Sequence, residues 1–307
     1  MNTLFGVIIP YVAVAIFLIG ILYKITKWSQ TPVPFRIPTT CGQHVSLPWL
    51  KANKLDNPPN NLYVIARMVL EVFLFRSLWR NTKTEIKPDK QKLIYGGNKW
   101  LWLLGLLFHL SLFIIIIRHL RILIEPVPWV IKQLNTLDGA FDILLPAVYL
   151  TEILLVVALV YLFTRRVVFP QLRYISLPSD YLALILILGT AITGICMRIW
   201  WKVDVVAVKE LALSVLRFSP DAPDGLGWLF YTHLTFVSVL LAYFPFSKMM
   251  HAGGIFFSPT RNLASNSRVK RHVNPWDYPV KVHTYEEYED EFRDKMIAAG
   301  MPVEKEQ

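Results

Sequence analysis

Four of the seven histidines in this chain stand within, or at the ends of, strongly apolar stretches. His109 and His119 lie ten residues apart in one stretch, and His233 and His251 lie eighteen residues apart in another. Ionisable side chains are costly inside a membrane and tend to mark function there. A single such histidine is more often a packing residue, but two pairs confined to two stretches indicate ligands.

The spacing of these histidines is compatible with two shared sites at different depths. In a helix, ten residues advance about 15 Å and eighteen residues about 27 Å. Two apolar runs separate the stretches, so we expect antiparallel helices in which His109 lies level with His251, and His119 with His233. Opposed imidazoles suit axial ligation of haem iron, and saturating both axial positions favours electron transfer. The two rises differ, so helix tilt, side-chain rotamers and a kink at Pro245 must together compensate for the difference.

Other uses of the histidines are less consistent with the sequence. A proton relay would employ Asp or Glu, and the centres of the two stretches contain none. A zinc site would need clustered ligands. Two cysteines, Cys41 and Cys196, are too few to ligate an iron–sulfur cluster within the chain. A structural anchor whose histidines only pack, and a transporter with a histidine proton path, remain open alternatives.

The composition is that of a membrane protein. Of 307 residues, 54% are hydrophobic and 18% charged, whereas about a quarter are charged in soluble domains. Helices satisfy their own backbone groups in lipid, so we expect an all-α integral membrane protein, a five-helix bundle. About 20 apolar residues suffice to cross, and the expected spans are about 4–23, 100–120, 143–163, 181–200 and 228–250.

One further apolar segment, 62–80, does not fit this pattern because it carries four charged residues. Arg67 and Glu71 share a helical face, while Arg76 and Arg80 lie roughly opposite. We expect a helix lying against the cytoplasmic face of the membrane, with a sixth span as the alternative.

The net charge of +10 reflects the orientation of the protein in the membrane rather than nucleic-acid binding, because the basic residues gather in alternate loops between the expected spans. This pattern places the protein in the cytoplasmic membrane with its N-terminus outside and its C-terminus in the cytoplasm. No Lys or Arg precedes the first apolar run, so we interpret it as a retained span. We expect a membrane domain at 1–257 with a cytoplasmic insert at 24–98. A cytoplasmic tail at 258–307 follows, with a short helix at 285–300 that ends at Gly300.

Several stretches resemble a known family. "THLTFVSVLLAYFPFSKMMH", 232–251, with its FPFSKMMH ending, is similar to the last span of the respiratory nitrate reductase gamma subunit, a membrane cytochrome b. "IPYVAVAIFLIG" and "DYLALILILGTAITGI" resemble that family's first and fourth spans, and the histidine spacings match as well. The insert at about 35–98 and the tail "NPWDYPVKVHTYEEYEDEF" resemble the related DsrM and HmeC subunits.

The resemblance implies a dihaem cytochrome b that exchanges electrons with menaquinone or another quinone. It places a cytoplasmic-side haem b between His109 and His251 and an outer-side haem b between His119 and His233. The implied partners are a cytoplasmic, heterodisulfide reductase-like iron–sulfur subunit (DsrK-like), other DsrMKJOP-type subunits and, indirectly, the sulfur carrier DsrC. A gamma-type anchor of another respiratory oxidoreductase, such as nitrate reductase, is the alternative. The resemblance does not imply a direction of electron flow.

Four basic residues are further candidates. In "WVIKQ", Lys132 is the nearest equivalent of the family's quinone-site lysine, although a snorkelling surface lysine explains it equally well. Arg118 and Arg121 flank His119, and Arg198 ends the fourth expected span. Arginine forks suit haem propionates, while interfacial anchoring is the ordinary alternative.

Overall fold

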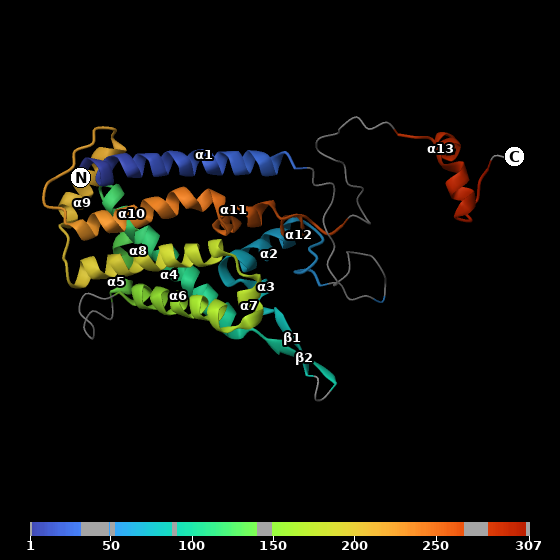
Figure 1. The fold of residues 1–307 in the computed structure, drawn as a ribbon, viewed down its shortest axis with the longest axis horizontal. Coiled ribbons are helices and arrows are strands. Elements are labelled where there is room, and N and C mark those ends of the chain that lie inside the picture. The colour runs from blue at the N-terminus through green and yellow to red at the C-terminus, as the bar shows by residue number, and fades with distance from the viewer. Residues whose placement is uncertain are drawn as a thin grey trace.

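The protein is mostly helical, and five long helices run side by side along one axis (Figure 1). The computed structural model describes residues 2–31, 49, 53–87, 91–139, 149–266 and 282–304, without the side chains of 82–85 and 87. A π-helical turn, Leu4–Ile8, leads into the first helix. The long helices are α1 (Ile9–Ser29), α4 (Lys99–Leu123), α6 (Leu150–Val168), α8 (Pro178–Ile199) and α10 (Trp228–Tyr243).

Four of the expected spans are confirmed as helices long and apolar enough to cross a membrane. They are Leu4–Ser29, Lys99–Leu123, Pro178–Ile199 and Trp228–Phe246. The remaining expected span, 143–163, which is third in chain order, is helical from Leu150, and 143–148 lie outside the described residues. Its helix α6 carries three charged residues, Glu152, Arg165 and Arg166, which makes it more polar than the other four.

The long helices pack in the order α1, α10, α8, α6, α4. The core between α4, α6 and α8 is apolar, and its centre on α6 is fully enclosed: Ala158 is 0% and Leu159 1% exposed. The two helices that carry the histidines therefore have different main neighbours, because α4 packs on α6 while α10 packs on α8 and α1. This arrangement holds α4 and α10 in register through α6 and α8.

Short helices close both ends of the bundle (Figure 1). At the end where α1 begins lie α5 (Trp129–Asp138) and α9 (Val205–Leu216). At the opposite end the short helices are α2 (Asn61–Leu74), α3 (Arg76–Trp79), α7 (Pro170–Ile175), α11 (His251–Gly254) and α12 (Pro259–Asn262).

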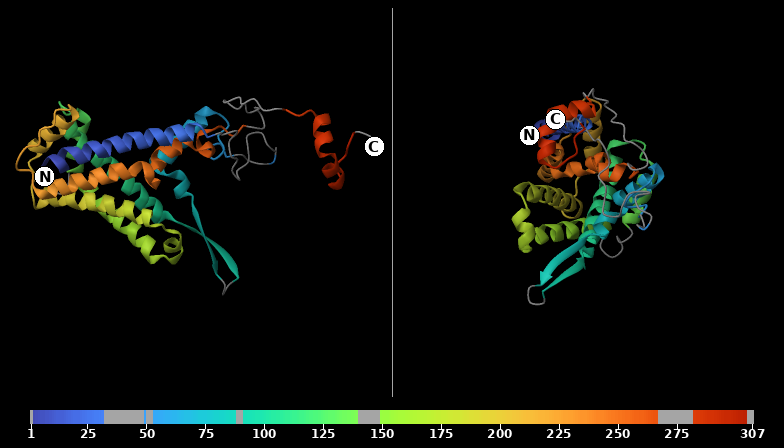
Figure 2. Two further views of the ribbon diagram at one scale, coloured as in Figure 1. Left: turned by 45° about the horizontal axis from the view of Figure 1, so that its top comes forward. Right: turned by 90° about the vertical axis from the view of Figure 1, so that its right-hand side faces the viewer.

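The expectation of an all-α fold was wrong in one place, because the insert contains an antiparallel hairpin. Strand β1 (Thr82–Lys87) pairs with β2 (Lys92–Gly97), with Ile86 opposite Leu93. The hairpin projects from the bundle (Figure 2). The segment TKTEIK alternates β-branched and charged residues, a pattern that is typical of strands, and KLIYGG contains the β-prone residues Ile94 and Tyr95.

The segment 62–80 forms two helices, not one. It is interrupted at Phe75, whose backbone is left-handed at φ 50° and ψ 47°. The longer piece, α2, has 14 residues and reaches about 21 Å, which is short of the roughly 30 Å hydrocarbon thickness. Arg67 and Glu71 share a face as expected, and that face is buried. Arg67 donates to the carbonyl of Thr260 at 2.9 Å, so α2 packs on α12.

A cluster of charges fixes this part of the insert. We call residues 53–80 and 258–266 the insert cap. The buried carboxylate of Asp56 accepts hydrogen bonds from Arg76, at 2.5 Å, and from Arg80. Burial alone would raise the pKa of Asp56, but the hydrogen bonds and charges of Arg76 and Arg80 outweigh it and lower this pKa to about 2. The ionised Asp56 therefore stabilises the insert cap.

The C-terminal helix α13 (Tyr285–Ala298) matches the expected helix at 285–300. Thr284 and Glu287 form a capping box at its start. Gly300 follows its end at φ +67°, a conformation that glycine adopts without steric cost. The preceding residues 267–281 lie outside the described residues.

Replacing Asp56 with asparagine should loosen the insert cap. The lowered pKa corresponds to about 2 kcal/mol of stabilisation, which is present at neutral pH and is lost as the pH falls from 3.8 towards 2. At neutral pH we expect Asp56→Asn to speed hydrogen exchange of the α2 amides by roughly 30-fold, as a change of 2 kcal/mol implies. Asp294→Asn, at an exposed site in α13, is the control. Equal exchange in both variants would contradict the role of Asp56.

Candidate functional site

The structure brings His109 and His251 together. Their ring centroids lie 5.8 Å apart with the ring planes at 83°. His109 comes from the third turn of α4, and His251 begins α11. Metal–imidazole bonds are about 2 Å long, so imidazoles on opposite sides of one metal have centroids about 6 Å apart. This pair therefore has the spacing that a shared metal between the two rings requires.

His119 and His233 both lie nearer the other end of the bundle. His119 lies in the last turns of α4 and His233 in the second turn of α10. The ring spacing of 5.8 Å supports the expected pairing of His109 with His251, and the expected pairing of His119 with His233 stays a prediction.

Each of the four imidazoles uses its Nδ1 atom for a hydrogen bond. Nδ1 of His109 lies 2.7 Å from the carbonyl of Gly105, that of His119 2.7 Å from the carbonyl of Ile115, and that of His251 2.7 Å from the carbonyl of Lys248. A carbonyl only accepts, so each Nδ1 carries the proton and donates it. The lone pair is then on Nε2, which is the state of a metal-ligating histidine.

His233 reaches the same state through a hydroxyl group on α8. Its Nδ1 lies 2.9 Å from Oγ1 of Thr193, whose own proton goes to the carbonyl of Gly189 at 2.7 Å or of Thr190 at 3.1 Å. The Thr193 oxygen therefore accepts the Nδ1–H of His233. The next residue of α8, Gly194, leaves room for the ring, because a Cβ there would lie 3.3 Å from Cε1 of His233.

The last span is not one continuous helix, so the rise of about 27 Å expected for the eighteen residues from His233 to His251 does not hold. Helix α10 ends at Tyr243, a 3-10 turn covers Phe244–Phe246, and Ser247 is extended at ψ 173°. Pro245 lacks an N–H group and cannot continue the helix ladder. It also packs closely on α1, because a Cβ at Gly20 would lie 2.6 Å from Cβ of Pro245. The break redirects the chain so that His251 turns towards His109.

The segment after the break is anchored to the start of α8. Both oxygens of Asp180 accept from Nζ of Lys248, at 2.7 and 2.9 Å. Ser247 caps the next turn by accepting the N–H of Met249 at 3.1 Å. The carbonyl of Lys248 then receives Nδ1–H of His251. In FPFSKMMH, the proline, serine and lysine thus position the histidine.

The arginines near the His119–His233 end belong to a buried polar cluster. Arg118 binds the carboxylate of Asp138, which also accepts from the N–H and hydroxyl of Thr151 at 2.9 and 2.6 Å. The Arg118 and Arg198 guanidinium groups lie 3.3 and 3.4 Å from the ring centroid of Tyr149. Glu152 lies 3.7 Å from Arg198 and 4.0 Å from Arg118.

The other candidates lie apart from the histidine contacts. Lys132 is exposed on α5, at the same end of the bundle as His119, and Arg121 is half-buried in the last turn of α4. Sequence reasoning missed Thr193, Asp138 and Glu152. Glu152 could have been found from the sequence, because it is an acidic residue within an apolar run. The contact between Thr193 and His233 spans 40 residues and has no local signature.

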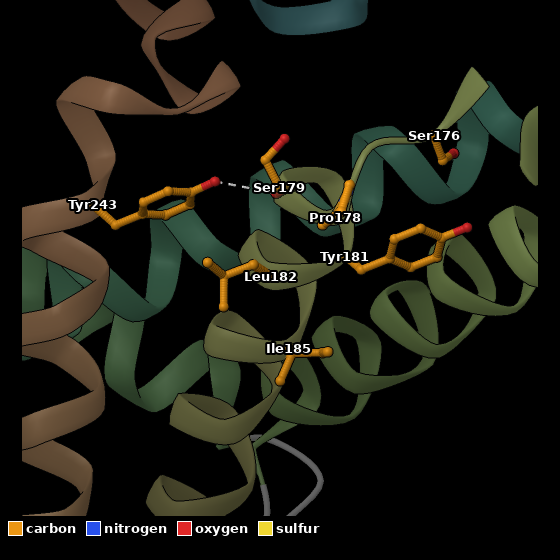
Figure 3. A pocket seen from close by; sticks show the side chains of 7 residues that line it. All are labelled: Ser176, Pro178, Ser179, Tyr181, Leu182, Ile185 and Tyr243. Carbon is orange, nitrogen blue, oxygen red and sulfur yellow. Dashed lines mark hydrogen bonds between the residues drawn. The ribbon is translucent and has the colours of Figure 1, made fainter. Parts of the chain in front are cut away.

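An open groove of about 780 Å³ lies at the opposite end of the bundle from Lys132, between α7, α8 and α10 (Figure 3). Its walls include Leu182 and Ile185, with two tyrosines at the rim. Tyr243 donates to the carbonyl of Ser179 and Tyr181 to that of Arg166, both at 3.3 Å. The groove therefore presents mainly apolar surface and contains none of the four histidines.

Comparison with known proteins agrees with this geometry. Residues 62–272 match the family model described as nitrate reductase gamma subunit. The "Hdr-like menaquinol oxidoreductase cytochrome b-like subunit" of Archaeoglobus fulgidus is 44% identical over 283 residues, covering 90% of this chain and 84% of the relative. The protein of the same name from Archaeoglobus profundus is 42% identical over 276 residues, covering 88% of this chain and 81% of the relative. The chain is a multi-pass membrane protein that belongs to the nitrate reductase gamma subunit family.

Proposed function

We propose that this protein is a dihaem cytochrome b that carries electrons from menaquinol across the membrane to a cytoplasmic iron–sulfur partner. Its four histidines carry the proposal. They come from α4 and from the broken last span, and the rings of His109 and His251 lie 5.8 Å apart. Each of the four directs its Nδ1 proton to an acceptor, which leaves Nε2 for iron. The relatives named as menaquinol oxidoreductase subunits support quinol oxidation as the direction.

The residues fit haem in two further respects. The His109–His251 ring spacing of 5.8 Å matches two ligands of one iron. Gly194 also leaves space beside the His233 ring that a larger side chain would fill. When bound, haem supplies reversible one-electron chemistry at iron. The protein holds the ligands, orients their rings and keeps the two sites at fixed depths through the packing of α6 and α8.

We assign the His119–His233 pair to the outer side and the His109–His251 pair to the cytoplasmic side. In this arrangement α6 crosses the membrane together with the four other long helices, which makes five spans. The N-terminus is then outside and the C-terminus in the cytoplasm. The basic insert then lies on the cytoplasmic side, as the positive-inside rule favours. Helix α6 runs antiparallel to both α4 and α8 and packs on each, which supports its crossing.

Quinol oxidation is assigned to the outer end of the bundle. Lys132 is exposed there on α5 and is our candidate for contacting the quinol. Arg121 and Arg198 are the candidates for holding the propionates of the outer haem. Arg118 already binds Asp138, so its main contribution is to fix the end of α4 next to His119.

The partner that best matches this chain is a heterodisulfide reductase-like iron–sulfur subunit of the DsrK type. The names of the relatives, which contain "Hdr-like", and the likeness of the insert and tail to DsrM support it. The process would then be dissimilatory sulfur metabolism, with other DsrMKJOP-type subunits in the complex and DsrC as the indirect substrate carrier.

Replacing any one of the four histidines with alanine should remove about one of two haems. The measurement is pyridine haemochrome quantification on purified protein, with His283→Ala, an exposed tail histidine, as the control. Because two ligands share each iron, the members of one pair should lose the same haem. Wild-type protein without b-type absorption, or unchanged haem content in all four variants, would contradict the proposal.

Thr193→Val should weaken the outer haem site while preserving side-chain shape. It removes the acceptor of the His233 Nδ1–H, and loss of such a supporting hydrogen bond typically lowers metal affinity 10–100-fold. Gly194→Ala should act in the same direction, because its Cβ would press on the His233 ring.

Gly227→Ala is the matched glycine control for these two variants, since an added Cβ there meets no described atom within 4 Å. Haem retention during dilution is the measurement. Equal retention of both haems in Thr193→Val, Gly194→Ala and Gly227→Ala would argue against His233 as a ligand.

The number of crossings determines where the two chain ends lie. With α6 in the membrane the ends are on opposite sides, and without it they are on the same side. In a background lacking Cys41 and Cys196, single Asn2→Cys and Met301→Cys variants can be labelled with an impermeant maleimide in oriented vesicles. We expect labelling of only one of them from each side. Labelling of both from one side would contradict five spans.

A further inference from the structure

The insert places an aromatic ring directly on one of the paired histidines. The ring of Phe75 lies 4.9 Å from that of His109, with the planes at 89°. His109 has two other ring neighbours, Phe108 at 4.8 Å and His251 at 5.8 Å. The imidazole of His109 is therefore confined by two phenylalanine rings in addition to the hydrogen bond from Nδ1 to Gly105.

Phe75 occupies its position in an unfavourable backbone conformation. Its φ of 50° and ψ of 47° are left-handed, which is rare for a bulky residue and easy for glycine. Such strain persists only where the surroundings enforce it and tends to occur at functional sites. A glycine here would form the same break between α2 and α3 without the strain, but it would leave no ring on His109.

Hydrogen bonds on both sides of Phe75 enforce this conformation. Before it, the Leu74 carbonyl accepts from Nε1 of Trp102 on α4 at 2.7 Å. After it, the N–H of Ser77 donates to Glu71 at 3.0 Å, and the Ser77 hydroxyl donates to the same carboxylate. Glu71 is 5% exposed, so this link is buried. Together these bonds tie the break to α4, the helix that carries His109.

We propose that Phe75 is a positioning residue that fixes the plane of the His109 imidazole nearly perpendicular to that of His251, an inference that rests on the proposed function. An imidazole held only at Nδ1 can still tilt about its hydrogen bond. The Phe75 and Phe108 rings block this motion, so the His109 ring keeps its plane relative to that of His251. The mutual angle of the two ligand planes governs the magnetic anisotropy of ferric iron, and ligand orientation with burial tunes its potential.

The competing interpretation is that Phe75 merely packs the insert against α4. The two interpretations differ in what a substitution changes. If Phe75 only packs, its loss destabilises the protein but leaves the spectrum and potential of bound haem as they were. If Phe75 positions His109, the haem between His109 and His251 changes while the haem between His119 and His233 serves as an internal reference.

The test uses the full chain in detergent with both haems bound. The variants are Phe75→Leu, which keeps apolar bulk without the ring, and Phe75→Tyr, which keeps the ring. Phe73→Ala is the matched control, because Phe73 is the neighbouring phenylalanine of α2 and is 60% exposed. The readouts are the ferric low-spin electron paramagnetic resonance spectrum and a potentiometric titration of both haems. His251→Ala identifies which signal belongs to the His109–His251 haem.

We expect Phe75→Leu to shift the low-field resonance and the midpoint potential of that haem alone, with Phe75→Tyr and Phe73→Ala close to wild type. Unchanged signals in Phe75→Leu, or an equal change in Phe73→Ala, would overturn the role of Phe75. Loss of haem content in Phe75→Leu without any shift in the remaining signal would also overturn it in favour of packing. Wild-type protein without haem would instead refute the proposed function, so the two failures are distinguishable.

Discussion

The hydrogen bonds from the Nδ1 atoms of four histidines are the constraint on which the rest of the structure depends. Three of them end on backbone carbonyls within one turn of the same segment, at Gly105, Ile115 and Lys248. Because a carbonyl cannot donate, the tautomer is decided by the fold and not by a bound group. The ligand-ready state of these imidazoles is therefore built into the main chain, and the helices only need to bring the rings to matched depths.

The two ends of the bundle achieve this in different ways. On α4, both histidines use the carbonyl four residues earlier, so the helix itself orients them. In the last span, His233 depends on Thr193 of the neighbouring helix, and His251 depends on a break in its own chain. The break needs Pro245 to end the helix and the Asp180–Lys248 ion pair to hold the segment that follows. Helix α8 consequently supports both histidines of the last span, His233 through Thr193 and His251 through the Asp180–Lys248 ion pair.

Much of this arrangement could be predicted from the sequence, and the exceptions have physical causes. The order of the histidines along the bundle follows from the antiparallel course of α4 and the last span, whereas helical rise predicted unequal separations of about 15 Å and 27 Å. The break at Ser247 changed the geometry after Pro245, because a proline shows that a helix ends but not where the chain then goes. In the hairpin at 82–97 only the first strand has an alternating pattern, and the short apolar run of the second does not distinguish a strand from a helix. The contacts of Thr193 and Asp138 link distant segments, and no local pattern specifies them.

The insert gives the His109–His251 end an environment that the helices alone would not provide. Arg67 and Glu71 are buried, and each is bound to protein groups: Arg67 to carbonyls of Asp56 and Thr260, Glu71 to Ser77. Buried charges that are satisfied in this way specify one arrangement, because any displacement leaves a charge without its partner. The same end receives α12 and the segment that carries His251. An insert held by such bonds fixes the surroundings of one histidine pair, whereas at the other end Arg118, Asp138 and Tyr149 fix the helix ends around His119. The two ends of the bundle thus present the same histidine chemistry with different groups around it, and in the proposed function these differences would give the two haems different potentials.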